Sequence, residues 1–425
     1  MNFFMYSKCG EGAGLMKKLQ DEGNDCSISI LEKDYSNIYD GILKKSDFPD
    51  EDAIMIFDSS GMGTRADSLR AGGYKVFGAS KFHDKLENDR KFGLNFMESN
   101  GILIPETCDF TNFSEGIKFV KENKKKRYVF KPSGKNLPCK LTYSSSDTED
   151  LLLYMNYVEK NFGKDVEEFI LQEFIEGAII STEYWVGKKG FVLPVNHTIE
   201  VKKLMNDDLG PSTGCAGNIV WKGDDDSEIT SLLNSIEDEL VKEGYIGPID
   251  INCIVNEEGI YGLEWTPRFG LDAMPTFLQL LNQDVGKLIS DSFNDIEDME
   301  ILDYFAGGVR ITIPPYPIES PERIEKNLQK ISPNVGIPIR GFEYCQDNCY
   351  FYEIMKDNDL IVHSSGTGVI ACVSDLGMTP ESCFDFPYDI LEECKVPDKQ
   401  YRTDLDEILP RMYKEVKGVL ENVYS

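Results

Sequence analysis

Two apolar runs separated by a polar turn mark residues 244–270 and predict a β-hairpin. In GYIGPIDINCIVNEEGIYGLEWTPRFG the runs lie on either side of Asn256–Gly259, which is a turn signal between two buried strands. Asp250 and Glu264 interrupt the runs at core positions, where a carboxylate costs several kcal/mol unless it is paired. Arg268 follows closely enough to hold an anion beside the acids. This set suits a magnesium ion bridging nucleotide phosphates, and ordinary salt bridges in a core hairpin are the alternative.

Short apolar strands, glycine turns and helical segments alternate over the first 105 residues. Strands are predicted at Asn2–Tyr6, Ala53–Phe57 and Lys75–Phe77, and helices at Leu15–Gln20 and Arg65–Ala71. This order predicts an open parallel sheet, whose ligand crevice lies at the carboxyl ends of its strands. The glycine-rich turn at residues 10–14 could cradle a phosphate at a helix N-terminus, or it could be a tight turn without a ligand.

Two basic residues lie at positions from which they could reach a phosphate. Arg90 belongs to an amphipathic segment, Asp84–Asn100, that predicts one long helix. Lys131 closes the apolar strand Tyr128–Lys131 and precedes a Pro-Ser-Gly turn, so it would extend from a sheet toward a loop as a point charge. The four bases at residues 124–127 are interpreted as a solvated entry to that strand.

Two later segments offer backbone groups to a small ligand. Phe169–Ile175 is predicted to be a buried strand whose end could bind an adenine edge through free N–H and C=O groups. Glu183 could accept hydrogen bonds from a ribose, or it could be an exposed strand glutamate. Gly210–Gly217 is predicted to be a small-residue loop whose amides approach a ligand closely.

Composition limits the classes of function. A chain of 425 residues exceeds the size of one hydrophobic core, so we expect two or three domains. The net charge of −30 opposes binding to nucleic acid or acidic membranes, so an anionic substrate needs a local basic site. No apolar run is long enough to span a membrane, and the 11 cysteines form no CxxC pairs, which favours a cytoplasmic protein. Three scattered histidines argue against a zinc site or a histidine triad.

Taken in order, these segments resemble the ATP-grasp ligases, and most closely the phosphoribosylamine–glycine ligases. Val76–Lys81 with Leu86–Phe96 is similar to that family's FGPSK…LEGSKAF, and Val129–Gly134 to its VIKADG. Four further matches follow along the chain: Leu171–Gly177 with EEFLDG, Lys202–Gly217 with KR…GPNTGGMG, Leu263–Gly270 with LEFNCRFG, and Lys395–Leu405 with the closing YRTDIG. The resemblance therefore covers nearly the whole chain.

The resemblance implies an α/β protein, α+β overall, with the ATP-grasp fold. It implies an N-terminal open parallel α/β domain at 1–105, an ATP-grasp domain at 106–300 and a small β-rich closing domain at 301–425. ATP phosphates would be held by Arg90 and Lys131, and the adenine by the hinge Glu173, Phe174 and Ile175. The further implied roles are metal binding by Asp250, Glu264 and Thr266, substrate binding by Lys202, Lys203, Gly210, Pro211, Ser212, Thr213 and Gly214, and charge stabilisation by Arg268.

Several positions depart from the family pattern. Thr266 replaces a metal-binding asparagine, which puts a second magnesium in doubt. Residues 135–140 replace a glycine-rich phosphate loop and contain a proline, which predicts a stiffer lid. Cys9–Gly14 lacks the GGREHA arrangement that contributes to phosphoribosylamine binding, and Asp58–Gly61 differs from GPEAPL. The changes at these two turns fall in the domain that recognises the amine.

The implied function is an ATP-dependent carboxylate–amine ligase that works through an acyl phosphate. The first expectation is glycine joined to 5-phosphoribosylamine in purine synthesis, with ATP and Mg²⁺ or Mn²⁺ as cofactors. The alternatives are the same chemistry on another amine or amino acid, and a nucleotide-binding protein without catalysis. An NAD-dependent oxidoreductase is disfavoured because no acid about 20 residues beyond Gly14 matches the ribose partner. Small-molecule substrates are expected, with no nucleic acid or membrane partner, in a monomer or homodimer.

Overall fold

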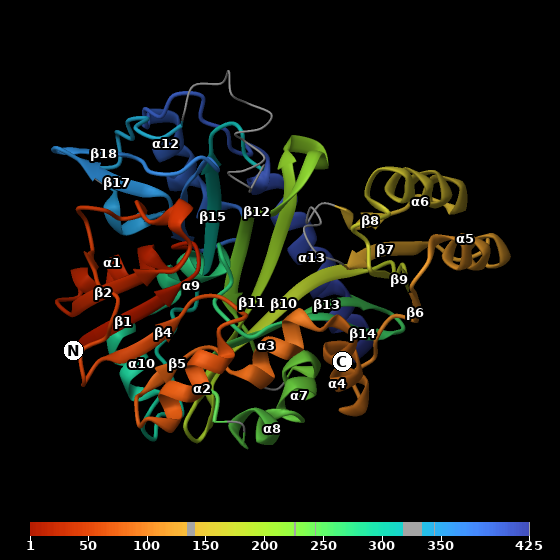
Figure 1. The fold of residues 1–425 in the computed structure, drawn as a ribbon, viewed down its shortest axis with the longest axis horizontal. Coiled ribbons are helices and arrows are strands. Elements are labelled where there is room, and N and C mark those ends of the chain that lie inside the picture. The colour runs from red at the N-terminus through yellow and green to blue at the C-terminus, as the bar shows by residue number, and fades with distance from the viewer. Residues whose placement is uncertain (134–140, 225–226, 243, 318–333, 344, 425) are drawn as a thin grey trace.

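The structure is a computed structural model that describes residues 1–133, 141–224, 227–242, 244–317, 334–343 and 345–424. A parallel sheet at the N-terminus, a small lobe and a long antiparallel sheet make up the molecule (Figure 1). Within the described residues, none of the helices has the length and apolar character needed to cross a bilayer.

The N-terminal sheet has five parallel strands in the order β3-β2-β1-β4-β5, which confirms the predicted open parallel sheet. Alternate residues of β1 pack on opposite faces, and both faces are buried, as is usual for a parallel sheet. The elements are β1 (Asn2–Ser7), α1 (Ala13–Asp21), β2 (Asp25–Ile30), β3 (Lys44–Lys45), β4 (Ile54–Phe57), α2 (Gly63–Ala71) and β5 (Val76–Phe77). The strands β2 and β3 were not predicted.

The prediction of one long helix at Asp84–Asn100 is wrong. The segment forms α3 (Lys81–Asn88) and α4 (Arg90–Ser99), which are separated at Asp89. The Asp89 side chain accepts a hydrogen bond from Phe92 N–H at 3.0 Å and so caps the second helix. Arg90 therefore lies in the first turn of a new helix.

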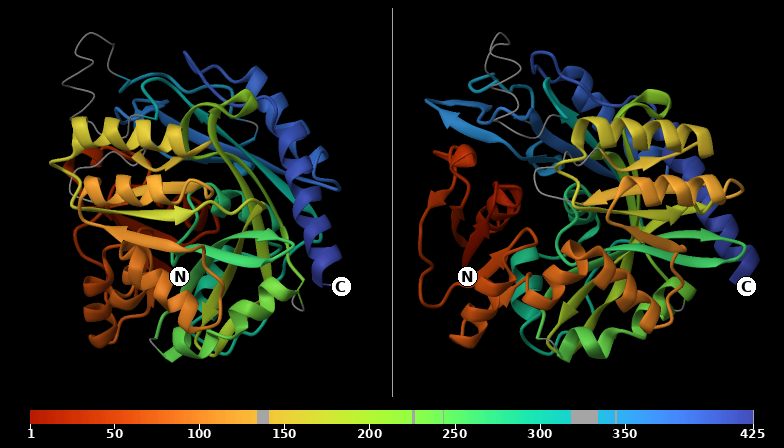
Figure 2. Two further views of the ribbon diagram at one scale, coloured as in Figure 1. Left: turned by 90° about the vertical axis from the view of Figure 1, so that its right-hand side faces the viewer. Right: turned by 45° about the vertical axis from the view of Figure 1, so that its right-hand side comes forward.

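A separate lobe carries Lys131 and the hinge. Its antiparallel sheet has the order β6-β9-β7-β8, and α5 and α6 cover it (Figures 1 and 2). The lobe has its own hydrophobic core, in which Phe130 and Phe169 pack against each other. The elements are β6 (Thr107–Phe110), α5 (Phe113–Glu122), β7 (Tyr128–Ser133), β8 (Tyr143–Ser144), α6 (Thr148–Phe162) and β9 (Glu168–Glu173). The predicted lid at 135–140 lies outside the described residues.

The largest sheet has eight strands in the order β14-β13-β10-β11-β12-β15-β19-β16. The elements up to residue 300 are β10 (Ala178–Gly187), β11 (Gly190–Met205), η3 (Asn206–Asp208), β12 (Leu209–Lys222), α7 (Glu228–Asn234), α8 (Glu237–Lys242), β13 (Gly247–Asn256), β14 (Gly259–Thr266), α9 (Ala273–Leu280) and α10 (Val285–Asp291). The predicted hairpin at 244–270 is thus confirmed as β13 and β14. The helix α13 runs along one side of this sheet (Figure 2).

The C-terminal part continues the same sheet. Its elements are β15 (Phe305–Thr312), β16 (Cys349–Phe351), β17 (Ile354–Asp357), β18 (Leu360–His363), β19 (Val369–Gly377), α12 (Asp385–Glu393) and α13 (Leu405–Tyr424). Because β15 pairs with β12, hydrogen bonding crosses the predicted boundary at residue 300. The three-domain division stays a prediction.

Candidate active site

One face of the β13–β14 hairpin carries all of its polar side chains. Side chains alternate along a strand, so Asp250 and Asn252 share a face, while Ile251 and Cys253 enter the core. The register places Thr266 opposite Asp250 and Glu264 opposite Asn252. Asn252 Nδ2 donates to Asp250 Oδ1 at 2.9 Å. The hairpin thus presents two carboxylates together with amide and hydroxyl oxygens.

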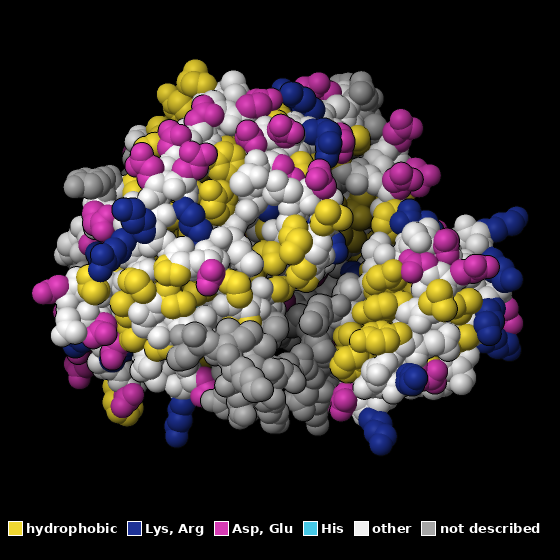
Figure 3. Space-filling view, turned by 90° about the horizontal axis from the view of Figure 1, so that it is seen from above, with side chains coloured by type: hydrophobic (Ala, Val, Ile, Leu, Met, Phe, Trp, Pro, Cys, Tyr) yellow, Lys and Arg dark blue, Asp and Glu magenta, His cyan; other side chains and the backbone are white. Residues whose placement is uncertain are grey.

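Four cations converge on Glu264. Burial alone would raise the pKa of its carboxyl, but the surrounding positive charges hold the pKa below its ordinary value. Their sources, in decreasing order of effect, are Lys202, Lys131, Arg90 and Arg268. The Glu264 side chain is nevertheless exposed to solvent. Figure 3 shows the surface hollowed between the lobe and the rest of the molecule.

Lys131 extends from β7 as predicted, and Gln172 of β9 holds it. Lys131 Nζ donates to Gln172 Oε1 at 2.7 Å, and Gln172 is 2% exposed. Burial lowers the pKa of Lys131 to about 8, and Glu264 opposes this shift. Arg90 contributes a buried Nη1 that has no hydrogen-bond partner among the described residues. An unpartnered buried donor beside a lysine suits an anion.

The hinge residues connect the lobe to the long sheet. Glu173 N–H donates to Glu106 O at 2.8 Å, and Phe174 N–H donates to Arg127 O at 2.9 Å, so protein carbonyls already use these two donors. The Glu173 carboxylate pairs with Lys126 at 3.0 Å. Ile175 lies just outside β9, and no intramolecular backbone hydrogen bond to its N–H occurs in the described part of the chain. The hinge therefore retains a donor at Ile175 for a ligand.

Glu183 lies in the interior of β10 and not at the hinge. It is opposite Asp250, roughly 16 Å along the strand from Ala178. Its side chain is 5% exposed, and burial raises its pKa to about 8. The alternative of an exposed strand glutamate is wrong, and this placement gives the predicted ribose role no support. Burial, and next the charge of Glu183, raise the pKa of Asp250 well above its ordinary value.

The predicted loop at Gly210–Gly217 is wrong, because the segment is part of β12. It pairs with β11 through irregular register, with Ser212 opposite Lys203 and Gly217 opposite Val201. Lys203 Nζ donates to Gly210 O at 3.3 Å, whereas Lys202 lies 3.8 Å from Glu200 and acts on Glu264. The structure thus separates the two lysines that we grouped as substrate ligands.

The remaining members of the predicted substrate segment lie near the β11–β12 tip. Gly210, Ser212 and Gly214 are exposed, and Pro211 is half-buried. Thr213 Oγ1 donates to Lys202 O at 2.8 Å and so fixes the backbone next to the cation cluster.

Arg268 is already engaged by an acid from α3. Arg268 Nη2 donates to Glu87 Oε1 at 2.8 Å, and Nε donates to the same oxygen at 3.0 Å. Its charge still acts on Glu264, and Glu11 of the N-terminal turn is close enough to raise the pKa of Arg268. Arg268 therefore links the hairpin acids with the N-terminal domain.

The oxygen ligands fit a magnesium ion that also binds phosphates. Within the described residues, no three acidic, histidine or cysteine side chains form a metal cluster. Magnesium usually takes only one or two carboxylates and completes its shell with waters and substrate phosphates. Asp250 and Glu264, with the neutral oxygens of Asn252 and Thr266 nearby, match that requirement.

A second part of the site lies where the N-terminal turn faces the C-terminal strands. A cavity of about 250 Å³ is present there, with a lining of Cys9, Gly10, Glu11, Tyr35, Ile38, Leu271, Arg310, Tyr316, Tyr352, Glu353, Thr367 and Val369. The Glu200 carboxyl lies within range of both Lys202 and Arg310, so this cavity adjoins the cation cluster.

Several amides of the N-terminal turn have partners within the protein. Gly12 N–H donates to Asp58 Oδ2 at 2.8 Å, and Gly10 N–H donates to Ser7 Oγ at 2.7 Å. Leu15 N–H donates to the Tyr350 hydroxyl at 2.8 Å. Of the two interpretations of this turn, the structure favours the one without a phosphate.

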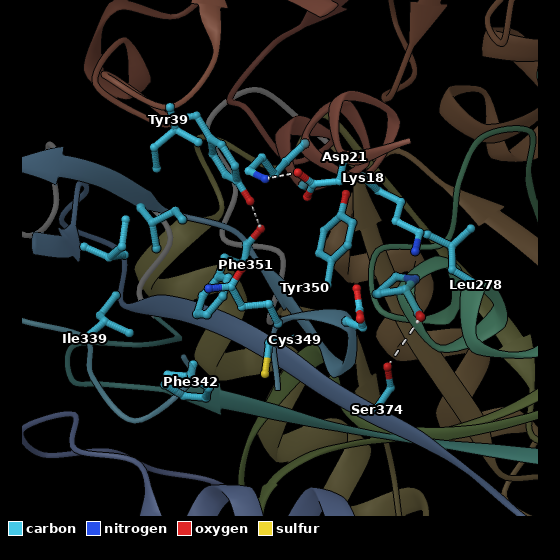
Figure 4. Close-up of a pocket in the computed structure, with 18 of the residues that line it drawn as sticks. Lys18, Asp21, Tyr39, Leu278, Ile339, Phe342, Cys349, Tyr350, Phe351 and Ser374 are labelled. Carbon is cyan, nitrogen blue, oxygen red and sulfur yellow. Dashed lines mark hydrogen bonds and ion pairs between the residues drawn. The ribbon is translucent and has the colours of Figure 1, made fainter. Parts of the chain in front are cut away.

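A larger cavity of about 560 Å³ contains none of the predicted site residues (Figure 4). It lies between α1, α9 and the segment around β16, with Lys18 and Leu278 on its wall. Tyr39 and Phe351 meet across it through a hydrogen bond of 2.8 Å. Its size alone does not connect it with the chemistry at Glu264.

Sequence reasoning missed four residues that shape the site: Asn252, Gln172, Glu87 and Glu200. The two-residue spacing from Asp250 could have indicated Asn252. Gln172 and Glu87 act through partners more than 40 residues away in the sequence, so no local pattern marks them.

Comparisons with known proteins agree with this geometry. A model of the family described as "Phosphoribosylglycinamide synthetase, ATP-grasp (A) domain" matches residues 88–273. A solved phosphoribosylamine–glycine ligase from Thermotoga maritima superposes with a TM-score of 0.72 at 18% identity, covering 94% of this chain and 99% of that chain. The chain has the ATP-grasp fold.

Other similar proteins agree with this fold. A biotin carboxylase domain from Hydrogenobacter thermophilus, solved with MgADP and bicarbonate, has a TM-score of 0.62 at 13% identity and covers 99% of both chains. Phosphoribosylamine–glycine ligase from Streptococcus pneumoniae is 22% identical over 351 residues, 80% of each chain. The human trifunctional purine biosynthetic protein adenosine-3 is 24% identical over 237 residues, which span 54% of this chain but only 23% of that protein. The predicted ATP-grasp fold is thus confirmed.

Proposed function

We propose that this ATP-grasp protein is an ATP-dependent ligase that joins a carboxylate to an amine through an acyl phosphate. A carboxylate oxygen attacks the γ-phosphorus of ATP, and ADP leaves. The amine nitrogen then attacks the acyl carbon; a C–N bond forms, the C–O bond to phosphate breaks, and the amine loses a proton. The chemistry needs positioning and charge neutralisation and no side-chain nucleophile.

The convergence of four cations on Glu264 is the observation that supports this proposal most strongly. A triphosphate carries a dense negative charge, and a single basic side chain would not neutralise it in a strongly acidic protein. Lys131 and Arg90 would contact the phosphates, because one is an ammonium near a buried amide and the other has an unpartnered donor. Arg268 would keep its bond to Glu87 and act on the developing charge by proximity.

Asp250 and Glu264 would hold Mg²⁺ or Mn²⁺, with Thr266 or Asn252 as a neutral ligand. The bound ion would neutralise phosphate charge and orient the γ-phosphate. Glu173, Phe174 and Ile175 would border the adenine, with the Ile175 N–H as the available donor.

The relatives' names supply the first candidate substrates, glycine and 5-phosphoribosylamine, in purine synthesis. The second candidate is the same chemistry on another amine, and the satisfied amides at Gly12 and Gly10 favour it. Small-molecule substrates, a monomeric or homodimeric state and a cytoplasmic location stay predictions.

Trapping with hydroxylamine tests the proposal without knowledge of the natural amine. The full chain is incubated with MgATP, hydroxylamine and a panel of carboxylates that includes glycine. We expect hydroxamate and ADP in equal amounts with at least one carboxylate, and no hydroxamate without a carboxylate. ATP binding without hydroxamate from any carboxylate would instead support a nucleotide-binding protein that has no ligase activity.

A further inference from the structure

The cavity beside the N-terminal turn is the available place for the amine. Electrostatic interactions link it with the phosphate end of the site: Glu11 acts on the pKa of Arg268, and Lys202 and Arg310 both act on the pKa of Glu200. Tyr316, on its wall, hydrogen bonds to Thr213 of β12. An amine held in this cavity would therefore face the carboxyl carbon of the acyl phosphate that forms near Glu264.

The arginine in this cavity is not available to a substrate anion. Arg310 Nε lies 2.7 Å from Asp272 Oδ2, and Nη2 donates to Asp272 Oδ1 at 2.8 Å. Arg310 Nη1 donates to the Tyr316 hydroxyl at 2.9 Å, and both members of the ion pair are buried. Among the described lining residues there is no other lysine or arginine.

Two backbone amides near this cavity are also engaged. Gly12 and Leu15 N–H groups, at the start of α1, would suit a phosphate if they were free. Asp58 takes the first and Tyr350 takes the second. A substrate phosphate would have to displace a carboxylate that the protein already holds in that position.

The described lining of the cavity contains two carboxylates, Glu11 and Glu353. Glu353 is 8% exposed and accepts hydrogen bonds from Ser365 and His363, so the network of its own strand region satisfies it. Glu11 is half-buried, and the charges of Glu11 and Asp58 help raise the pKa of Cys9 after the effect of burial. Charges in a partly enclosed site are screened less than charges on an open surface.

We propose that the acceptor is a small amine without a phosphate, and that it carries a second, positively charged group that faces Glu11. This inference rests on the proposed ligase function and selects its second candidate. The cavity volume of about 250 Å³ admits a phosphorylated sugar amine as well, so charge and not size makes the selection. The neutral nitrogen of the acceptor attacks the acyl phosphate, while its cationic group stays paired with the acid.

A matched series of two-carbon amines tests the proposal. The full chain, MgATP and the carboxylate found by hydroxylamine trapping are combined with 1,2-diaminoethane, ethanolamine or phosphoethanolamine, and freshly generated 5-phosphoribosylamine serves as a fourth acceptor. We expect kcat/KM for ADP release to fall by about tenfold or more from the diamine to ethanolamine, which is about 1.4 kcal/mol. Both phosphorylated amines should lie below ethanolamine.

Every other outcome decides against the inference. Equal rates, a preference for either phosphorylated amine, or reaction with none of the amines would overturn it while hydroxamate formation keeps the ligase function. Absence of hydroxamate with every carboxylate would overturn the ligase function and this inference with it.

A variant without the Glu11 charge tests whether this residue causes the preference for the diamine. Glu11→Gln should reduce the preference for the diamine over ethanolamine by about tenfold, because the paired charge is lost. Glu51→Gln, which changes an exposed acid of the same domain, is the control and should keep the wild-type preference. An unchanged preference in Glu11→Gln would overturn the assignment to Glu11.

Discussion

The two ends of this site differ in whether their polar groups have partners within the protein. Around Glu264, the charges of Lys202, Lys131, Arg90 and Arg268 all act on one carboxylate, and Arg90 keeps an unpartnered buried donor. Around the N-terminal turn, Asp58 accepts a hydrogen bond from the Gly12 N–H, and Asp272 pairs with the Arg310 guanidinium. Buried polar groups normally have hydrogen-bond partners. The unpartnered Arg90 donor therefore indicates a ligand, whereas the engaged groups near the N-terminal turn indicate a structural role. The comparison assigns the triphosphate to the first end.

The largest effect should come from the acid on which the cations converge. Glu264→Gln should lower kcat by about 10³-fold or more, because the carboxylate that would hold the metal is lost while size is kept. Steady-state ADP release measures the loss, and thermal unfolding should show an intact fold. Glu257→Gln, at the exposed turn of the same hairpin, is the control. Near-normal turnover in Glu264→Gln would remove this acid from the metal site.

A change at the end of the site near the N-terminal turn should lower the free energy of unfolding. Arg310→Leu leaves Asp272 buried without its partner, so the free energy of unfolding should fall by about 3–5 kcal/mol. Urea unfolding measures the change. The matched exposed pair is Lys189 and Asp295, 3.5 Å apart, and Lys189→Met should cost about 1 kcal/mol or less. Equal costs for the two variants would mean that the Arg310 pair is not a structural element.

The lysine of the lobe should affect nucleotide use more than folding. Lys131→Met should reduce kcat/KM for ATP by about 100-fold, the loss expected from one charged contact to a phosphate. Lys125→Met, which removes an exposed charge just before the same strand, should leave kcat/KM for ATP close to normal. A similar loss in both variants would indicate a general effect of positive charge on the lobe.

A smaller effect should appear on raising the pH. Burial lowers the pKa of Lys131 from 10.5 to about 8, so the ammonium that binds phosphate is present below pH 8 and is lost above it. KM for ATP should therefore rise by up to about tenfold per pH unit above pH 8. The unfolded chain binds one more proton at Lys131 than the folded chain between pH 8 and 10.5. The free energy of unfolding therefore increases as the pH is raised through this range. Loss of folding caused by the titration of Lys131 therefore does not explain the rise in KM for ATP.

The Lys131→Arg variant separates this titration from others. Arginine keeps its charge throughout this range, so KM for ATP in the variant should not rise above pH 8. A rise that persists in Lys131→Arg would assign the pH dependence to another group.

Local patterns predicted the elements that carry the chemistry. The turn at Asn256–Gly259 and the flanking apolar runs predicted the hairpin, and the end of an apolar strand placed Lys131 correctly. Both depend on residues close together in the sequence. Glycines and hydroxyl residues favoured a loop at 210–217, but pairing with β11 overrides that local preference.

Contacts between distant segments could not be predicted. Glu183 was assigned to ribose from its distance along the chain, yet sheet register places it opposite Asp250. Asp58 was noted only as part of an altered turn, and its hydrogen bond to Gly12 depends on β1 and β4 lying side by side. The sequence therefore revealed the residue types, and the fold determined which of them remain open to a ligand.

A structure of the full chain with magnesium and a non-hydrolysable ATP analogue tests the account most directly. We expect a phosphate oxygen within hydrogen-bond distance of Lys131 Nζ and a metal ion at about 2 Å from a Glu264 oxygen. A nucleotide bound elsewhere, or a metal ion that does not contact Glu264, would contradict it.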